Sequence, residues 1–411
     1  MARPLNGRLA RMFLLVPFLC ALPILCKAQD NVVCSAGFGS FDVDSTTGVT
    51  VSVGPLKQQS GLAQRACQAK LSWGTHELAL APGAAQVDVD LIEVDLGFGS
   101  PVTALQIKQT DADPLMTYEI YSLAKPPRKL RTIAGGDFYR AADTNLDGRI
   151  EIWTHDVGAV SGFEGLRLSA IDFPPPLALR FEDQRLIDVS AEFPSRFDDQ
   201  IATVRAQLDA NELKEFKNSD GKLSGSYLLP VEELEGLLNT KIKVLEIVWS
   251  YLYSGRQQEA WHELQDMWPA SDFERIRAAI LDARARGIRA EVDGVSSGAL
   301  PGRRRKRTDI YDGLTENHGS DELKILQIDT QPRAIFLGGI VTPAEVPAAS
   351  LNLEAVVDLV LDAAGKVWSI KTEGKPNKDL IDASAQWKFV PGRKRGRPVA
   401  CHLRMEVALP Q

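Results

Sequence analysis

The first part of the chain alternates between apolar and polar positions in short runs. Residues 29–173 contain β-prone stretches such as Gly48–Val53, Val87–Ile92 and Tyr118–Tyr121, separated by glycine and proline. Alternation with frequent turn residues is typical of antiparallel sheets that bury one face. The pattern predicts a β-sandwich-like domain over residues 29–173.

A helical period replaces this alternation after the proline run at 174–176, a stiff break that we interpret as a domain boundary. Apolar residues recur at helical spacing in residues 198–217. Two further apolar-periodic segments, 241–255 and 256–268, resemble the helix pair of a tetratricopeptide repeat. We therefore expect a helical domain over residues 174–300.

Two signals mark the end of the helical domain. Ser271 and Glu274 have the spacing of a capping box, and Gly287 stops the apolar period, so a last helix is expected between them. Residues 301–325 then include the basic run Arg303–Arg307 and predict a flexible linker. Contact of this run with anionic lipid or another polyanion remains an alternative to a solvated linker.

Strand alternation returns in the C-terminal residues 326–411. Apolar residues alternate from Leu353 to Leu361, the segment Asp362–Gly365 predicts a turn, and residues 367–371 can return as a second strand. A short helix is expected over 378–386, and a last strand runs to residue 409. The expected order is ββαβ, and the whole chain is expected to be a multidomain α+β protein.

The last strand has two distinct faces. Its apolar face carries Cys401, which we expect to be a buried thiol. Its polar face carries His402, Arg404 and Glu406.

These C-terminal residues resemble a known family. Trp387, Phe389 and Pro391, followed by the step Gly396–Val399, lie between a helix and a final strand as in the TonB C-terminal domain. The resemblance covers about residues 353–411. It implies a periplasmic ββαβ module whose edge strand pairs with an extended peptide, such as a segment of an outer-membrane receptor.

Strand addition of this kind uses the unpaired backbone groups of an edge strand. We expect the last strand to be that edge, with His402, Arg404 and Glu406 as its partner-binding residues.

An acidic loop is the clearest chemical motif in the chain. Oxygen ligands alternate through the loop, and the expected metal ligands are Asp143, Asn145, Asp147, Arg149 through its carbonyl, and Glu151. This spacing suits Ca²⁺. The run into a β-prone segment resembles the loops of FG-GAP-type repeats, although the chain has one copy. We predict a structural calcium site; a metal-free turn rich in Asp and Asn is the alternative.

The N-terminal residues predict export. Three arginines precede the apolar run Met12–Leu25, and small residues before Gln29 predict a signal peptide over residues 1–28. The expected location is the periplasm or the exterior of a Gram-negative type bacterium. In such an oxidising compartment Cys34 and Cys67 are the natural disulfide pair. An uncleaved inner-membrane anchor, with membrane contact through this segment, is the alternative.

Charge and motifs narrow the function further. A formal net charge of -7 argues against a nucleic-acid partner. The five histidines are scattered, and the chain has neither His-Glu-x-x-His nor Cys-x-x-Cys. We therefore expect a non-catalytic envelope protein that binds a protein or peptide through its C-terminal module. The alternative is a membrane-anchored TonB-type energy transducer for outer-membrane transport.

Overall fold

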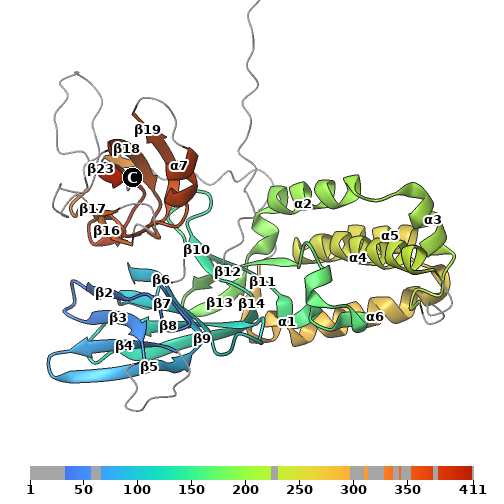
Figure 1. Ribbon diagram of the computed structural model, residues 1–411, viewed down its shortest axis with the longest axis horizontal. Helices are drawn as coiled ribbons and strands as arrows, with labels where there is room; N and C mark the ends of the chain where they lie inside the picture. The colour runs from blue at the N-terminus through green and yellow to red at the C-terminus, as the bar shows by residue number, and fades with distance from the viewer. Residues whose placement is uncertain are drawn as a thin grey trace, which may run out of the picture. The chain divides into compact units, whose positions relative to one another are not determined.

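Strands dominate the first and last parts of the chain, and most helices lie in the middle (Figure 1). The structure is a computed structural model, and it describes residues 33–56, 66–223, 230–296, 310–312, 328–336, 342–343, 353–373 and 378–409. The predicted signal peptide and the basic run Arg303–Arg307 lie outside the described residues. Residues Asn31–Gln411 form one compact unit. The expected mixed α+β class is confirmed, with several sheets and the helices α1 to α7.

Two antiparallel sheets form the N-terminal part. The first has the order β1-β6-β7-β8-β9 and the second β2-β3-β4-β5. The first sheet consists of β1 (Cys34–Ser35), β6 (Gln86–Val94), β7 (Val102–Lys108), β8 (Met116–Ser122) and β9 (Arg128–Gly136). The second consists of β2 (Phe41–Asp44), β3 (Thr50–Pro55), β4 (Cys67–Trp73) and β5 (His76–Ala84).

The two N-terminal sheets share one hydrophobic core. Val51 and Leu71 of one sheet and Val89 and Leu105 of the other belong to the same buried cluster. The predicted disulfide between Cys34 and Cys67 is confirmed, and it joins β1 to β4. It therefore links the two sheets covalently.

A third sheet crosses residue 174, where the proline run suggests a boundary. Its order is β10-β11-β12-β13-β14. The strands are β10 (Arg140–Ala142), β11 (Glu151–His155), β12 (Pro176–Glu182), β13 (Arg185–Asp188) and β14 (Gly294–Val295). Strand β11, which precedes the proline run, thus pairs directly with β12, which begins at the last proline of the run.

The helical part is built around α4, a long helix whose buried residues contribute to the largest core of the protein. The helices before the C-terminal module are α1 (Val157–Val160), α2 (Pro194–Ala206), α3 (Ala210–Lys217), α4 (Val231–Tyr253), α5 (Gln257–Met267) and α6 (Phe273–Arg286). Short 3-10 turns lie at Phe163–Gly165, Leu168–Ala170, Ser190–Glu192, Ala270–Asp272 and Ile288–Glu291. None of the helices in the described part of the chain has the length and apolar character needed to cross a membrane.

Two helix boundaries differ from the sequence prediction. The single segment expected over 198–217 is two helices, because the Asp209 carboxylate accepts hydrogen bonds from the amides of Asn211 and Glu212 and starts α3. The capping box at Ser271 is wrong, since α6 begins at Phe273 without a side-chain cap. The carboxylate of Asp272 instead accepts hydrogen bonds from Trp268 Nε1 and from Arg275.

We use the name C-terminal module for the described residues from 328 onward. Strand β23 pairs with β18 along its whole length, and β18 pairs with β19. Trp387 and Phe389 are almost fully buried in the core of the module. The main elements are β18 (Leu353–Leu361), β19 (Val367–Thr372), α7 (Lys378–Ser384), β20 (Lys388–Val390), β21 (Arg393–Lys394), β22 (Arg397–Pro398) and β23 (Cys401–Leu409). Three short strands join them: β15 (Tyr311–Asp312), β16 (Arg333–Phe336) and β17 (Thr342–Pro343).

Candidate functional site

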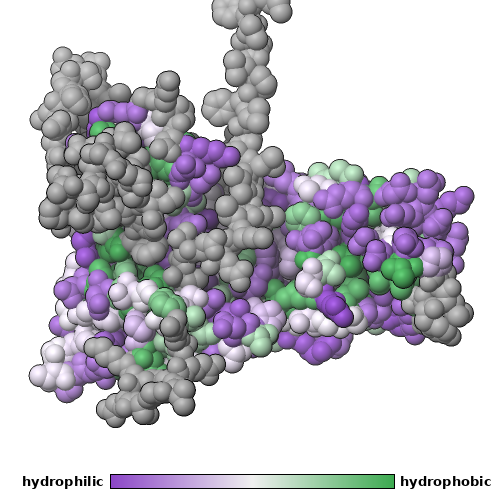
Figure 2. All heavy atoms as spheres, viewed as in Figure 1, coloured by the Kyte–Doolittle hydropathy of each residue, from purple (hydrophilic) through white to green (hydrophobic). Residues whose placement is uncertain are grey.

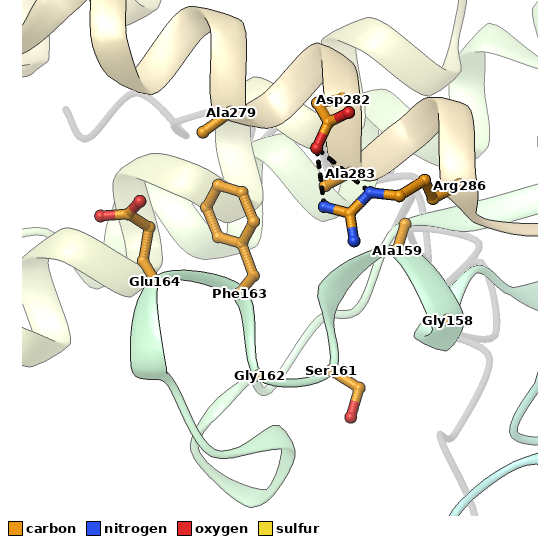
Figure 3. Close-up of a pocket in the computed structure, with 10 residues that line it drawn as sticks. All are labelled: Gly158, Ala159, Ser161, Gly162, Phe163, Glu164, Ala279, Asp282, Ala283 and Arg286. Atoms are coloured by element: carbon orange, nitrogen blue, oxygen red, sulfur yellow. Dashed lines mark hydrogen bonds and ion pairs between the residues drawn. The ribbon is translucent and has the colours of Figure 1, made fainter.

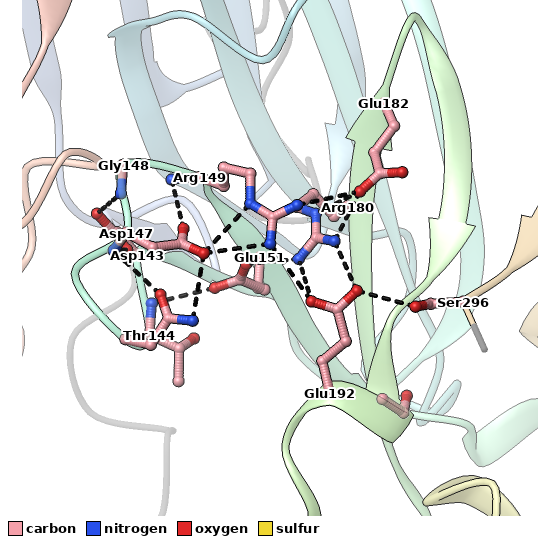
Figure 4. Close-up of polar contacts among 12 residues, drawn as sticks. Asp143, Thr144, Asp147, Gly148, Arg149, Glu151, Arg180, Glu182, Glu192 and Ser296 are labelled. Atoms are coloured by element: carbon pink, nitrogen blue, oxygen red, sulfur yellow. Dashed lines mark hydrogen bonds and ion pairs between the residues drawn. The ribbon is translucent and has the colours of Figure 1, made fainter. Parts of the chain in front are cut away.

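The acidic loop connects β10 to β11 and is folded by its own carboxylates (Figure 4). Asp143 accepts hydrogen bonds from the amides of Asp147 at 2.9 Å and Gly148 at 2.8 Å. Gly148 has a φ of 80°, which a glycine adopts without strain. The amide of Asp147 also reaches Asn145 Oδ1 at 3.1 Å. The sequence motif therefore forms a tight loop in which the side chains of Asp143 and Asn145 accept hydrogen bonds from amides of the same loop.

Two arginines form ion pairs with the Asp147 and Glu151 carboxylates. Arg149 Nη2 lies 3.1 Å from Asp147 Oδ2, and Arg180 Nη1 lies 3.2 Å from Glu151 Oε1. Arg180 belongs to β12 and is 2% exposed, while Glu151 is fully buried. Arg180 also contacts Glu192 Oε1 at 2.8 Å (Figure 4). The loop is thus the edge of a network of carboxylates and arginines that continues into the third sheet.

Burial makes two loop carboxylates weak acids. Loss of hydration raises the pKa of Asp143 to about 7 and the pKa of Glu151 to about 7. Asp362, in the β18–β19 turn, accepts a hydrogen bond from the Asp143 amide at 2.8 Å. Burial likewise raises the pKa of Asp362 to about 6. The loop therefore places two buried carboxyl groups, which hold their protons more tightly than exposed ones, beside the C-terminal module.

The five predicted calcium ligands lie in one loop, but their carboxylates do not converge. In the described part of the chain, no group of three or more His, Cys, Asp and Glu side chains could hold a metal ion. The guanidinium of Arg149 lies on Asp147, and that of Arg180 lies on Glu151. A cation bound by Asp147 would have to displace the Arg149 side chain, so the calcium site stays a prediction.

Sequence reasoning missed the cationic half of this network. Arg180 interrupts the apolar run Leu177–Phe181 of β12. A charged residue within a strand that is buried on both faces needs a partner, because an unpaired buried charge is costly. The arginine within this apolar run indicates that a buried ion pair exists. The sequence alone does not identify Glu151 and Glu192 as the partners of Arg180.

A nucleophile-elbow spacing was also overlooked. Gly294 and Gly298 flank Ser296 as in Gly-x-Ser-x-Gly. In the structure the Ser296 hydroxyl is 2.9 Å from Glu192 Oε1, and Glu192 is paired with Arg180. A serine nucleophile requires a free base beside it, whereas this carboxylate is held by an arginine. The contact therefore supports a structural role for Ser296.

The second candidate site is the outer strand β23. His402, Arg404 and Glu406 are exposed, whereas Cys401 and Val407 lie in the core of the module. Arg404 lies opposite Asp358 of β18, and their side chains form an ion pair at 3.8 Å. Arg404 also pairs with Glu373. The alternating faces predicted for this strand are confirmed.

The register shows which backbone groups of β23 point away from β18. Val356 O accepts a hydrogen bond from Glu373 N, so the backbone groups of Val356 point toward β19. Backbone direction alternates along a strand, so Val357 points toward β23 and meets Met405. The amides and carbonyls of Arg404 and Glu406 must then face the opposite, outer side.

Short strands of the same chain occupy both ends of this outer side. β15 pairs with Cys401 and His402, and β17 pairs with Val407 and Ala408. Among the described residues, no strand pairs with 403–406 on that side. Only part of the expected docking edge is therefore unpaired in the described residues. His402 pairs with β15, and the outward backbone groups of Arg404 and Glu406 form a short unpaired stretch, which we call the window.

A small hollow lies between the segment 158–164 and helix α6 (Figure 3). Its volume is about 230 Å³, and Phe163 points into the space between the two elements. Arg286 and Asp282 form an ion pair at 2.8 Å across one helical turn. The ten lining residues include neither histidine nor cysteine; their polar side chains are those of Ser161, Glu164, Asp282 and Arg286.

Hydrophobic residues form only small separate patches on the face drawn in Figure 2, among mostly hydrophilic ones. The exposed large hydrophobic side chains of the described residues are also scattered, for example Phe38, Val231 and Trp368. Scattered apolar residues are normal on protein surfaces. The described residues on this face form no broad apolar docking surface.

Comparison with known proteins gives no match to this chain, whether with family models, with curated proteins or with solved structures.

Proposed function

We propose that this chain is an exported, non-catalytic binding protein of the cell envelope. Its C-terminal module would bind an extended peptide as an added strand on the outer side of β23. The observation that carries the proposal is the short window of outward backbone groups at Arg404 and Glu406, flanked by β15 and β17. An outer-membrane receptor segment is the partner that the TonB-like residue pattern suggests.

Backbone pairing explains both the affinity and the expected limits of this site. An added strand satisfies amides and carbonyls that otherwise face water, and side-chain pockets then select its sequence. Here the exposed face beside the window is charged, with Arg404 paired to Asp358 and Glu373. We infer a partner strand with polar residues on that face and apolar residues on the other.

Two further features of the proposal concern the protein's environment. The disulfide between Cys34 and Cys67 is the kind of bond that persists in an oxidising compartment, which supports export. We also propose that Ca²⁺ binds the acidic loop, where Asp143, Asn145 and Asp147 would supply side-chain oxygens, as would Glu151. Burial raises the pKa values of Asp143 and Glu151, and a bound cation would favour their charged forms.

Peptide selection tests the proposed function. A displayed library of random twelve-residue peptides is selected on the full chain, and the selected peptides are measured against Arg404→Pro and Arg404→Ala. Proline removes the outward N–H at position 404 and is tolerated at strand edges, whereas alanine keeps that N–H. We expect Arg404→Pro to lose at least about tenfold in affinity, the worth of one hydrogen bond, and Arg404→Ala to bind within a few-fold of wild type.

The matched pair separates backbone pairing from side-chain recognition. Equal loss in both variants would mean that the Arg404 side chain, and not its amide, is recognised. Peptides that bind wild type and Arg404→Pro equally, or no selectable peptide at all, would contradict strand addition on this side of β23.

A further inference from the structure

Strand β6 carries two β-bulges on its pairing with β7. The register skips between Val89 and Leu91 and again between Ile92 and Val94, so Asp90 and Glu93 are the extra residues. A bulged residue leaves its backbone groups outside the ladder. Both residues are also acidic and buried. Buried carbonyls and carboxylates of this kind need partners from elsewhere.

The C-terminal module supplies those partners with three basic side chains. Lys366 Nζ lies 2.6 Å from Asp90 Oδ1 and 2.7 Å from the Asp90 carbonyl oxygen. Arg393 Nη2 donates to the Glu93 carbonyl at 2.6 Å and lies 3.8 Å from its carboxylate. Lys366 and Arg393 therefore each contact both the carboxylate and the backbone carbonyl of one bulged residue.

The third contact repeats this pattern next to the first bulge. Lys388 Nζ lies 2.5 Å from Asp88 Oδ1 and 2.6 Å from the Val89 carbonyl oxygen. Burial lowers the pKa of Lys388, and the Asp88 carboxylate opposes that shift. A lysine ammonium is removed from water only where paired groups replace its hydration. The three cations come from different elements of the module, yet all three contact the same strand, β6.

The remaining oxygens of the Asp88 and Asp90 carboxylates are held by β7 and β8 of the same sheet and by β10 of the third sheet. Asp90 Oδ2 accepts from the Tyr118 hydroxyl at 2.7 Å and from the Ala141 amide at 2.8 Å. Asp88 Oδ2 accepts from Gln106 Nε2 at 3.0 Å. The two carboxylates are thus fixed on one side by neighbouring strands, with their other oxygens directed at the module.

We propose that Lys366, Lys388 and Arg393 form a second binding surface on the C-terminal module, built for an acidic bulged strand, and that β6 of the same chain occupies it. The consequence is that the first N-terminal sheet and the module are held as one folding unit. This surface is separate from the window at Arg404 and Glu406, so a peptide can join β23 while β6 stays bound. The inference does not rest on the proposed function.

Amide hydrogen exchange of the full chain, without any peptide, tests this proposal. Lys388→Met and Arg393→Met remove one cation each while keeping an unbranched side chain. We expect both variants to raise exchange about tenfold or more in β6 and β20 together, because loss of docking opens both partners. Strand β3 and helix α4 should keep wild-type exchange.

Lys394→Met is the matched control, since Lys394 pairs with the exposed Asp329 rather than with β6. It should exchange like wild type throughout. If Lys388→Met does not fold, Arg393→Met decides the question, because the Arg393 side chain is 18% exposed and lies at the rim of the contact.

Two outcomes would overturn the proposal. Faster exchange in β20 alone, with β6 still protected in Arg393→Met, would show that the N-terminal sheet does not depend on the module. Protection of β6 that rises with protein concentration, together with a dimer in sedimentation, would show that a second copy of the chain supplies the strand.

Discussion

Buried ionisable residues decide much of this protein's chemistry. Arg180, Lys388 and Lys366 are all at least nine-tenths buried, and each is paired with carboxylates within hydrogen-bond distance. A buried pair is costly to form and more costly to break, because one partner is left charged without water. A substitution that neutralises one member of such a pair should therefore destabilise the fold, because the other member is left buried and unpaired.

Glu246 gives a pH prediction that is independent of the acidic loop. It lies in the middle of α4 and accepts a hydrogen bond from the Phe173 amide at 2.9 Å. Burial raises its pKa from 4.5 to about 7, so the folded chain holds a proton that the unfolded chain releases. The free energy of unfolding therefore falls as pH rises from about 4.5 to about 7, by on the order of 3 kcal/mol for this group.

Glu246→Gln should reduce the fall in the free energy of unfolding between about pH 5 and pH 7, since glutamine is neutral and keeps the acceptor oxygen. The part of the slope that comes from Asp143, Glu151 and Asp362 should remain. Urea denaturation at several pH values measures this slope. Glu259→Gln, at an exposed position of α5, is the control and should leave the slope unchanged. A Glu246→Gln chain with the wild-type slope would show that Glu246 is ionised in the folded protein.

The calcium proposal is tested by thermal unfolding before and after addition of Ca²⁺ to chelator-treated protein. Ligand that binds the folded state alone stabilises it by about 2.7 kcal/mol at a hundredfold excess over its dissociation constant. Asp147→Ala should remove the rise in midpoint, while the exposed control Asp199→Ala should keep it. A wild-type unfolding midpoint that does not change when Ca²⁺ is added would exclude a structural calcium site.

At the scale of elements, tight turns position the two candidate sites. The β18–β19 turn is closed by Asp362, which accepts hydrogen bonds from the amides of Ala364 and Lys366. The same Asp362 meets the acidic loop through the Asp143 amide. Gly365 in this turn has a φ of 76°, and a Cβ there would lie 2.0 Å from the Phe389 carbonyl oxygen. The turn is therefore a packing point between the hairpin and β20.

Gly365→Ala should destabilise the module by more than the cost of a left-handed alanine alone, which is about 1 kcal/mol. Gly396→Ala is the matched control, because Gly396 has a φ of 75° with nothing within 4 Å of its built Cβ. Urea denaturation followed by tryptophan fluorescence compares the two. Equal destabilisation would mean that the contact with Phe389 relaxes at no cost.

The sequence predicts local elements of the molecule far better than the contacts between them. The C-terminal strands are predictable because alternation, an Asp-x-x-Gly turn and a single buried face act within a few residues. The sheet β10 to β14 is not, because β14 joins it from more than a hundred residues away along the chain. The pairing of Lys366 with Asp90 is equally hidden, since each residue alone looks like an ordinary surface charge.

The whole molecule is therefore organised by long-range contacts of buried charge. The acidic loop touches the C-terminal module through Asp362, and β6 touches it through three cations. These contacts lie away from the outer side of β23. Among the described residues, no strand pairs with the outward backbone groups of Arg404 and Glu406, where we propose that a partner binds.

Amide exchange at Arg404 and Glu406, measured by NMR with and without a selected peptide, tests this account most directly. Strand addition predicts that these two amides slow by about tenfold or more on binding, while the amides of Leu403 and Met405, already paired with β18, change little. Saturated binding with unchanged exchange at Arg404 and Glu406 would contradict the account.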